Sequence, residues 1–400
     1  MPTQTRDAAI VGIYEYPKRK VEELSPLQIK AESAIKALQD AGLTWKDVDA
    51  IYECGEGGGV LSGIPATPEY FGIKANVIDT TMVGGASFEF QAAHAKRAIA
   101  AGKAKVALLT YGSTTRRDGA ALGSGGRTLS QGPAHPVGNM EDLWGLTLVG
   151  DYAMVAQRHM HLYGTTSEQL AEISVAARYH ATRNPQAMQA MQDLGYKSTG
   201  EITVEDVVES RIVADPLHRL ECCMISDGGG AAVIASADVA RDCRQKSAWI
   251  LGTGEAVKYP ESGGDITVSG AAQSGPPAFS EAGVKPDEID ITMLYDSFTI
   301  TVLTVLEDLG FCKKGEGGSF VEGGRLRFDS PAKPSLNTDG GGLSSNHPGM
   351  RGLFLLIEAT RQLRGESTSQ VDGASLAVAS GLGGRLGGRH SAGTVILGGD

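Results

Sequence analysis

The chain has 400 residues, a formal net charge of −11 and 41% hydrophobic residues. This composition is typical of a globular protein with two or more domains, and it excludes a mainly disordered chain. The negative charge argues against a nucleic-acid partner. No apolar run reaches the about 18 residues that a membrane span needs, so we also expect no membrane partner.

The cysteines and histidines do not form metal-binding patterns. There are five cysteines, an odd number, with no Cys-x-x-Cys pair, and the eight histidines are scattered without an HExxH motif. We therefore predict neither a disulfide framework nor a metal site. The start of the chain lacks the apolar stretch of a signal peptide, and together these features predict a cytoplasmic protein.

Strand and helix signals alternate from the beginning of the chain. Ala8–Ile13 is a short apolar run that predicts a strand. Apolar residues at helical spacing predict a helix over Pro26–Ala41, with Gly42 at its C-terminal cap, and Val48–Tyr52 is expected to form the next strand. A small-residue helix over Gly85–Ala101 and a strand from Val106 continue the alternation, which is typical of an α/β fold with a largely parallel, buried sheet.

Two segments resemble each other closely. Ala41–Tyr52 reads AGLTWKDVDAIY and Ala282–Tyr295 reads AGVKPDEIDITMLY; each has Ala-Gly, an acidic turn and a strand. A looser pair begins at Arg97 and Arg361, where helix, glycine, charged turn and apolar strand recur in the same order. The repeats predict two similar halves.

We place these halves at residues 1–250 and 251–400. Residues 112–217, approximately, have no counterpart in the second half. We interpret them as a loop domain inserted between two strands of the first half. Long insertions of this kind tend to carry substrate-binding surface.

Three polar segments are candidates for chemistry. Tyr295 and Asp296 follow a predicted strand, where ligands usually bind in α/β sheets, although Asp296 could instead cap the next helix. His347 lies in the glycine-dense loop LNTDGGGLSSNHPGMRG, which precedes an apolar helix. Near the end of the chain, Gly381 and Gly383 are expected to lie in a tight loop whose amides could bind an oxyanion.

Taken together, these motifs resemble the thiolase superfamily over essentially the whole chain. The repeated halves, the helix at Gly85–Ala101, YDSF at Tyr295, NHPG at Asn346 and GLGG at Gly381 occur in the family's order. The resemblance implies a thiolase fold, with two similar βαβ-rich halves and central helices between mixed sheets. It also implies a homodimer.

The sequence departs from the family pattern at its two reactive cysteines. Gly85 stands where thiolases carry the nucleophilic cysteine, and Gly381 stands where they carry the acid/base cysteine. Glycine cannot hold an acyl group, so ping-pong thiolysis is not expected. The chain is similar in this respect to lipid-transfer-protein-type aldolases, which lack these cysteines and work with a small partner that has an OB fold and a zinc ribbon.

The resemblance implies a role for each remaining candidate. His347 would polarise a thioester carbonyl, the amides of Gly85 and Gly383 would form a second oxyanion hole, and Tyr295, beside Asp296, would be the base. Three further residues would bind the coenzyme A part of an acyl-CoA substrate: Ser344, Asn346 and Gly381. The resemblance implies no tightly bound cofactor.

Three functions remain open at this point. The first is retro-aldol cleavage of a β-hydroxyacyl-CoA through an enolate. The second is acyl transfer with another nucleophile, such as Ser87. The third is a non-catalytic subunit that binds acyl-CoA within a complex.

Overall fold

The structure is a computed structural model that describes residues 6–54, 66–118, 147–258, 264–386, 388 and 390–400. Much of the predicted insertion, residues 119–146, lies outside these ranges. Within them, no helix combines the length and the hydropathy needed to cross a membrane.

Ten strands form one mixed sheet across the described part of the chain, in the order β10-β9-β11-β12-β8-β1-β7-β4-β2-β3. The bounds of these strands are β1 Ala8–Glu15, β2 Ala50–Tyr52, β3 Val77–Asp79, β4 Val106–Ser113, β7 Gly228–Ser236, β8 Ala248–Lys258, β9 Ile291–Leu294, β10 Ser335–Leu336, β11 Leu376–Gly384 and β12 His390–Gly398. A separate hairpin pairs β5 (Ile212–Ala214) with β6 (Leu217–His218).

The sheet consists of two five-stranded units with the same internal order. The first unit runs β1-β7-β4-β2-β3 and the second runs β8-β12-β11-β9-β10, so each strand has a counterpart in chain order. The predicted repeat is confirmed in detail. Gly42 and Gly283 each end a helix with positive φ, a short 3₁₀ turn follows, and the next strands are the matching β2 and β9.

Two features of the sheet differ from the sequence expectation. Pairs such as Ala9 with Trp249 join β1 to β8, so the two expected sheets are one continuous sheet. The sheet is also not largely parallel, because β1, β7 and β4 pair antiparallel, as do β11, β12 and β8. The hydrophobic pattern predicts that a strand is buried but does not specify which strand pairs with it.

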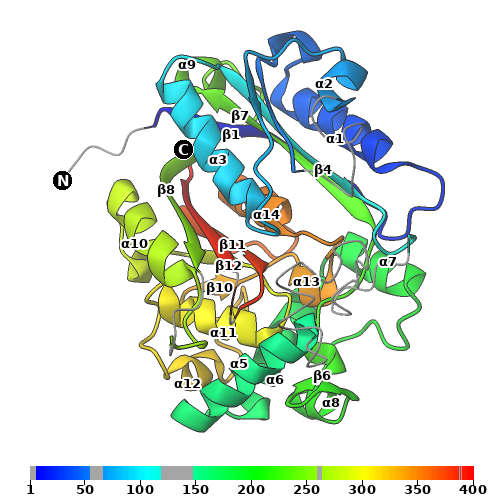
Figure 1. The fold of residues 1–400 in the computed structure, drawn as a ribbon, viewed down its shortest axis with the longest axis vertical. Helices are drawn as coiled ribbons and strands as arrows, with labels where there is room; N and C mark the ends of the chain where they lie inside the picture. Colours follow the sequence, from blue (N-terminus) through cyan, green and yellow to red (C-terminus); the bar gives the residue numbers. More distant parts are fainter. Residues whose placement is uncertain (1–5, 55–65, 119–146, 259–263, 387, 389) are drawn as a thin grey trace, which may run out of the picture.

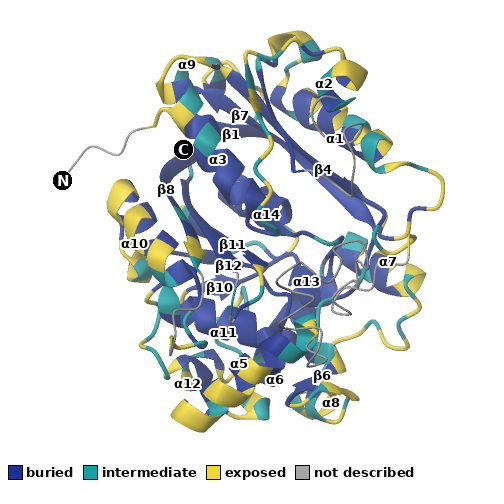
Figure 2. Ribbon diagram, viewed as in Figure 1, coloured by how far each residue is buried: buried dark blue, intermediate teal, exposed yellow. Residues whose placement is uncertain are grey.

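Two central helices lie between the two units of the sheet. They are α3 (Ser87–Ala100) and α14 (Gly352–Arg364), which contact each other and strands of both units. Figure 1 shows them in the middle of the molecule, and in Figure 2 they are mostly buried. The outer faces are covered by α1 (Pro26–Ala41) on β1, β4 and β7, and by α10 (Ala271–Ala282) on β8 and β12.

The first outer helix has the ends that its sequence predicts. Ser25 and Gln28 form a capping box, Pro26 occupies the first turn, and Gly42 takes the left-handed conformation at the C-terminal cap with φ 77°. These signals fix the ends of a helix locally, which is why α1 has the predicted bounds.

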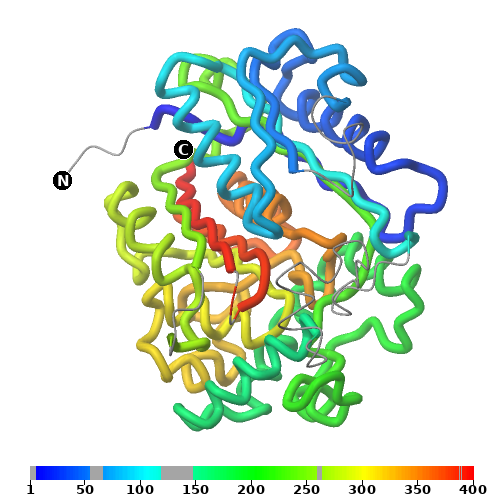
Figure 3. Tube along the Cα trace, in the orientation of Figure 1, coloured from blue at the N-terminus to red at the C-terminus, as the bar shows by residue number. Residues whose placement is uncertain are grey.

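The chain leaves the sheet between the neighbouring strands β4 and β7. The described part of this segment contains the helices α5 Leu148–Tyr163, α6 Ser167–Ala181, α7 Pro185–Asp193 and α8 Val204–Val208. Figure 1 shows α5, α6 and α8 at the bottom of the molecule and α7 at its right. Both α5 and α6 contact the helix α11, Thr299–Asp308. We propose that residues 112–217 are an insertion into a first half of about 250 residues, and this order of strands and helices supports the proposal. The chain trace in Figure 3 returns from these helices to β7.

The remaining helices are short or flank the candidate site. They are α2 Ala66–Phe71, α9 Ala237–Ala240, α11 Thr299–Asp308, α12 Gly317–Val321 and α13 Gly341–Ser344.

Candidate active site

The ring of Tyr295 occupies the space that a side chain at position 85 would need. A Cβ built on Gly85 would lie 2.2 Å from Cε2 and 2.4 Å from Cζ of Tyr295, and 2.4 Å from the carbonyl oxygen of Leu382. These separations are far below van der Waals contact. Position 85 is therefore glycine because the Tyr295 ring and the β11 backbone fill the place of a side chain.

The segment before α3 also lies directly against β11. A Cβ on Gly84 would lie 2.9 Å from Cα of Gly383, and a Cβ on Gly383 would lie 1.9 Å from the carbonyl oxygen of Val83. The structure thus brings together Gly85 and Gly383, the two glycines expected to line an oxyanion hole. The expected loop is wrong, however, because Gly381 and Gly383 lie inside β11, paired with β12. Strand β11 is thus longer than its glycine content indicated.

Tyr295 is held between β11 and the start of α14. Its backbone N–H donates to the carbonyl of Ser380 at 3.0 Å, and its phenol oxygen accepts from the backbone N–H of Arg351, the residue that caps α14. Burial raises the pKa of Tyr295 well above its usual value, and the Arg351 N–H acts in the opposite direction. A phenolate formed here would be stabilised by the positive end of the helix.

The imidazole of His347 packs edge-on against the Tyr295 ring, with ring centroids 5.4 Å apart. His347 is 3% exposed, and neither ring nitrogen has a hydrogen-bond partner in another described residue. Burial and the nearby Arg351 cation lower the pKa of His347 to about 3. The ring is therefore neutral at physiological pH and has an N–H to donate to a ligand.

Asp296 fixes the loop that carries His347. Its carboxylate accepts hydrogen bonds from the backbone N–H of Gly342 (2.8 Å) and of Leu343 (3.3 Å), and it lies 3.3 Å from Nε of Arg351. Arg351 is itself paired with Asp339 at 2.6 Å. Asp296 is fully buried, and burial raises its pKa while Arg351 opposes that change. Its contacts assign it a positioning role, in place of the predicted catalytic one.

The other predicted polar residues also hold the framework. Ser87 donates to the carbonyl of Gly84 at 2.6 Å and accepts from the N–H of Val83, so its hydroxyl stabilises the start of α3. Ser344 accepts from Nε of Arg178. Asn346 accepts from Ser226 and donates to Glu15. The predicted coenzyme A contacts through Ser344 and Asn346 are not supported, because both side chains are committed to internal hydrogen bonds.

A carboxyl group that no sequence motif marks lies under Gly381. Oε2 of Glu89 is 2.0 Å from the point where a Cβ on Gly381 would be. Gly85 lies before α3, whose N-terminal cap is Ala86, and Glu89 lies in the first turn of that helix. The sequence itself carries no signal that identifies this carboxyl group.

No thiolate replaces the missing nucleophile at this site. Cys223 lies nearest, with its N–H bonded to the carbonyl of Ser297, and burial raises its thiol pKa well above the usual range. Burial likewise raises the thiol pKa of Cys222 and Cys312 to about 12. No three His, Cys, Asp or Glu side chains among the described residues are arranged to hold a metal ion.

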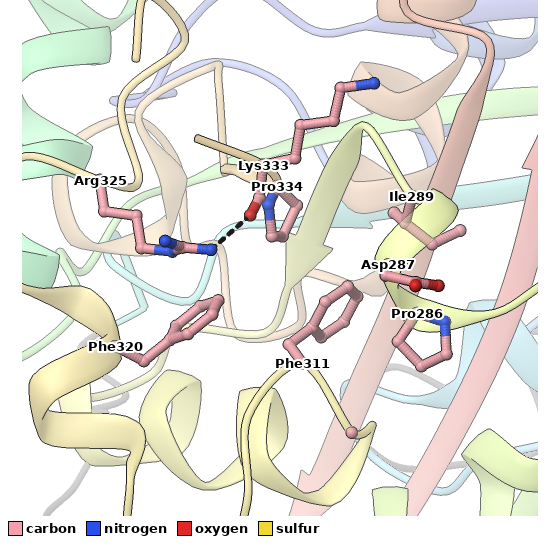
Figure 4. A pocket seen from close by; sticks show the side chains of 9 residues that line it. Pro286, Asp287, Ile289, Phe311, Phe320, Arg325, Lys333 and Pro334 are labelled. Atoms are coloured by element: carbon pink, nitrogen blue, oxygen red, sulfur yellow. Dashed lines mark hydrogen bonds between the residues drawn. The ribbon is translucent and has the colours of Figure 1, made fainter. Parts of the chain in front are cut away.

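A surface pocket of about 140 Å³ lies elsewhere, beside the edge of the second unit. It is lined by Phe311 and Phe320 and by Arg325, which donates to the carbonyl of Lys333 at 2.9 Å (Figure 4). None of the residues discussed above lines this pocket, so it is separate from the candidate active site.

Introducing cysteine at the missing position is expected to damage the fold rather than restore thiolase chemistry. Gly85→Cys would force its Cβ into the Tyr295 ring and the Leu382 carbonyl, and overpacking of this kind costs about 1–3 kcal/mol or more. Chemical denaturation should show this loss. The matched control is Gly200→Cys, because a Cβ there meets nothing within 4 Å. A Gly85→Cys protein as stable as the wild type would contradict the packing described here.

Comparison with known proteins agrees with this architecture. Residues 254–399 match the family model described as thiolase C-terminal domain-like. The chain is 32% identical to an acetyl-CoA acetyltransferase of Methanothermobacter thermautotrophicus, covering 95% of this chain and 97% of that protein. It is also 32% identical to a steroid side-chain-cleaving aldolase of Thermomonospora curvata, covering 91% and 92% of the two chains.

A solved structure described as an Ltp2-ChsH2(DUF35) aldolase superposes with a TM-score of 0.84 at 29% identity, covering 100% of this chain and 99% of that one. This superposition covers the whole chain, so it extends over both repeated halves and includes the segments that carry Gly85, Tyr295 and His347. The chain therefore belongs to the thiolase superfamily, as an aldolase-like member with glycine at both positions where the family pattern has cysteine.

Proposed function

We propose that this protein cleaves the Cα–Cβ bond of a β-hydroxyacyl-CoA by a retro-aldol reaction. The single observation that carries the proposal is the Tyr295 ring in the place of a nucleophile's side chain at Gly85. A site with a phenol in that position and the unpartnered imidazole of His347 beside it can stabilise an enolate but cannot form an acyl-enzyme.

The steps follow from the positions of the groups. Tyr295 accepts the proton of the β-hydroxyl, the Cβ–O bond becomes a carbonyl, and the Cα–Cβ electron pair moves into a thioester enolate. His347 and the amides of Gly85 and Gly383 stabilise the enolate oxygen. A proton then reaches Cα, which gives a carbonyl compound and a shorter acyl-CoA with no co-reactant.

The names of relatives alone do not choose between cleavage and acyl transfer. The acetyltransferase and the aldolase have the same sequence identity to this chain, 32% each. The site favours cleavage, because acyl transfer needs a nucleophile. Ser87, the candidate for that role, has its hydroxyl bonded to Gly84 and Val83. The aldolase assignment of the neighbour with a TM-score of 0.84 supports the same choice.

We further propose a cytoplasmic homodimer that works with a small OB-fold, zinc-ribbon partner, with coenzyme A entering only as part of the substrate. The solved structure described as an Ltp2-ChsH2(DUF35) aldolase names two components, which supports a partner. The edge strand β3 supports a dimer, because Ile78 on it is 51% exposed and nearby Met82 is 53% exposed. Light scattering of the purified protein, alone and with the partner, tests both associations.

A product assay tests the reaction itself. The protein, alone and with its partner, receives β-hydroxyacyl-CoA without free coenzyme A, and in parallel β-ketoacyl-CoA with free coenzyme A. We expect the hydroxy substrate to yield a carbonyl compound and a shorter acyl-CoA, with no coenzyme A consumed. Coenzyme A-dependent cleavage of the keto substrate would show a nucleophile and refute the proposal. Binding of both substrates without turnover would identify a non-catalytic subunit.

A further inference from the structure

Glu89 is a buried carboxyl group surrounded by glycines from three elements. It is 1% exposed, and neither carboxyl oxygen has a hydrogen-bond partner in another described residue. A Cβ on Gly381 of β11 would lie 2.0 Å from its Oε2, and one on Gly352 of α14 would lie 2.4 Å from the same atom. A Cβ on Gly393 of β12 would lie 2.6 Å from the Cβ of Glu89.

Such an arrangement is unfavourable for stability alone. A buried polar group without a partner costs free energy, and three glycines give up packing to make room for it. Unpartnered buried carboxyls of this kind are concentrated at sites that transfer protons. The carboxyl group also lies at a chemically informative place, because the family pattern has an acid/base cysteine at position 381.

We propose that Glu89 is the catalytic acid that gives a proton to Cα of the thioester enolate, taking over from α3 the role that a side chain at position 381 would have. This assignment rests on the proposed retro-aldol reaction. It adds to that reaction the residue that completes its second proton transfer.

The geometry places Glu89 on the same part of the backbone as Tyr295. A Cβ on Gly352 would lie 2.3 Å from the carbonyl oxygen of Gly85 and 2.4 Å from Oε2 of Glu89, so these two oxygens are close neighbours. The other side of Gly85 faces the Tyr295 ring. The base and the acid thus flank one glycine of the expected oxyanion hole.

The protonation state agrees with donation. Burial raises the pKa of Glu89 to about 8, and no charged side chain contributes. Glycines face it from α14, β11 and β12. Glu89 is therefore mostly protonated at neutral pH. In one turnover Glu89 loses a proton to Cα, and Tyr295 gains a proton from the substrate hydroxyl. Transfer of a proton from Tyr295 back to Glu89 then restores both groups, so no co-reactant is needed.

Exchange at Cα tests this role without requiring C–C cleavage. The purified protein, with its partner present, is incubated with propionyl-CoA in D₂O, and mass spectrometry follows deuterium entering Cα. The wild type should catalyse exchange, and Glu89→Gln should lower its rate by about 100-fold or more, the usual loss when a general acid or base is removed. Tyr295→Phe should retain exchange while losing cleavage. Exchange by Glu89→Gln at the wild-type rate would overturn the proposal.

Two further variants separate chemistry from folding. Glu358→Gln is the matched control, because Glu358 is also buried with a pKa raised by burial to about 7, but it bonds Thr338 and Ser367 away from Tyr295. It should exchange like the wild type. Glu89→Ala vacates the space beside Gly381, so adding Gly381→Cys should restore part of the exchange, whereas adding Gly381→Ala should not. Equal rates in these two double variants would count against a proton-transfer role.

Failure of this inference and failure of the proposed function give different results. Exchange that depends on Glu89 with no cleavage of any β-hydroxyacyl-CoA would refute the lyase reaction and leave the acid role standing. Cleavage by the wild type together with undiminished exchange in Glu89→Gln would refute the acid role of Glu89 and leave the lyase reaction standing.

Discussion

Tyr295→Phe is expected to lower the turnover number for β-hydroxyacyl-CoA cleavage by about 100-fold or more, the usual loss when a general base is removed. The variant keeps the ring that fills the space beside Gly85 and loses only the hydroxyl that accepts from the Arg351 N–H. The Michaelis constant and the melting temperature should therefore change little. Steady-state kinetics with a thermal unfolding control measure all three quantities.

The pH profile gives a second readout for Tyr295. Because burial raises the pKa of Tyr295 well above its usual value, the phenolate that serves as base becomes more populated as pH rises. Turnover should increase with pH through neutrality and level off near pH 8, where Glu89 begins to lose its proton. An unchanged rate in Tyr295→Phe would remove the phenol from the mechanism.

His347→Ala is expected to raise the activation free energy by about 3 kcal/mol, as loss of one oxyanion donor does in other enzymes. The effect should fall on kcat more than on KM, because the enolate oxygen carries more charge than the thioester carbonyl. A substrate analogue that binds without reacting should have a similar dissociation constant for both proteins. An equal loss in binding of that analogue would mean that His347 only holds the ground state.

The pH dependence of this loss has a defined sign. Burial and Arg351 lower the pKa of His347 to about 3, so the neutral ring is present above that value and is lost only in strong acid. The ratio of wild-type to His347→Ala rates should thus stay constant from about pH 5 to 9. A ratio that changes near pH 6.5 would show that an ordinary, solvated histidine titrates at this site.

Much of the fold was predictable because its signals are local. The glycine at 42 marked the end of the first outer helix, and the matching Ala-Gly at 282 and 283 revealed the repeat. The joining of β1 to β8 was not predictable, since it depends on two residue pairs that are distant in sequence. The hydrophobic pattern predicts that a strand is buried, whereas tertiary packing determines which strand pairs with it and in which direction.

The candidate site was predictable where the family pattern marks it and not elsewhere. The pattern named Tyr295 and His347, and their rings are in contact. Asn346 and Ser344 were expected to bind coenzyme A, but polar loop residues satisfy buried backbone and charged groups as readily as ligands. Glu89 was missed because a glutamate in a helix is normally a surface residue, and only the glycines around it show that it points inward.

The filled space at Gly85 also restricts the substitutions that this chain could accept. A cysteine at position 85 meets both the Tyr295 ring and the backbone carbonyl of Leu382, so it is tolerated only if the ring becomes smaller and the backbone shifts. Position 381 differs, because a side chain there meets only the end of the flexible Glu89 side chain, which can move aside. A change toward a cysteine nucleophile at position 85 would therefore remove the proposed base of the present reaction before the new chemistry exists.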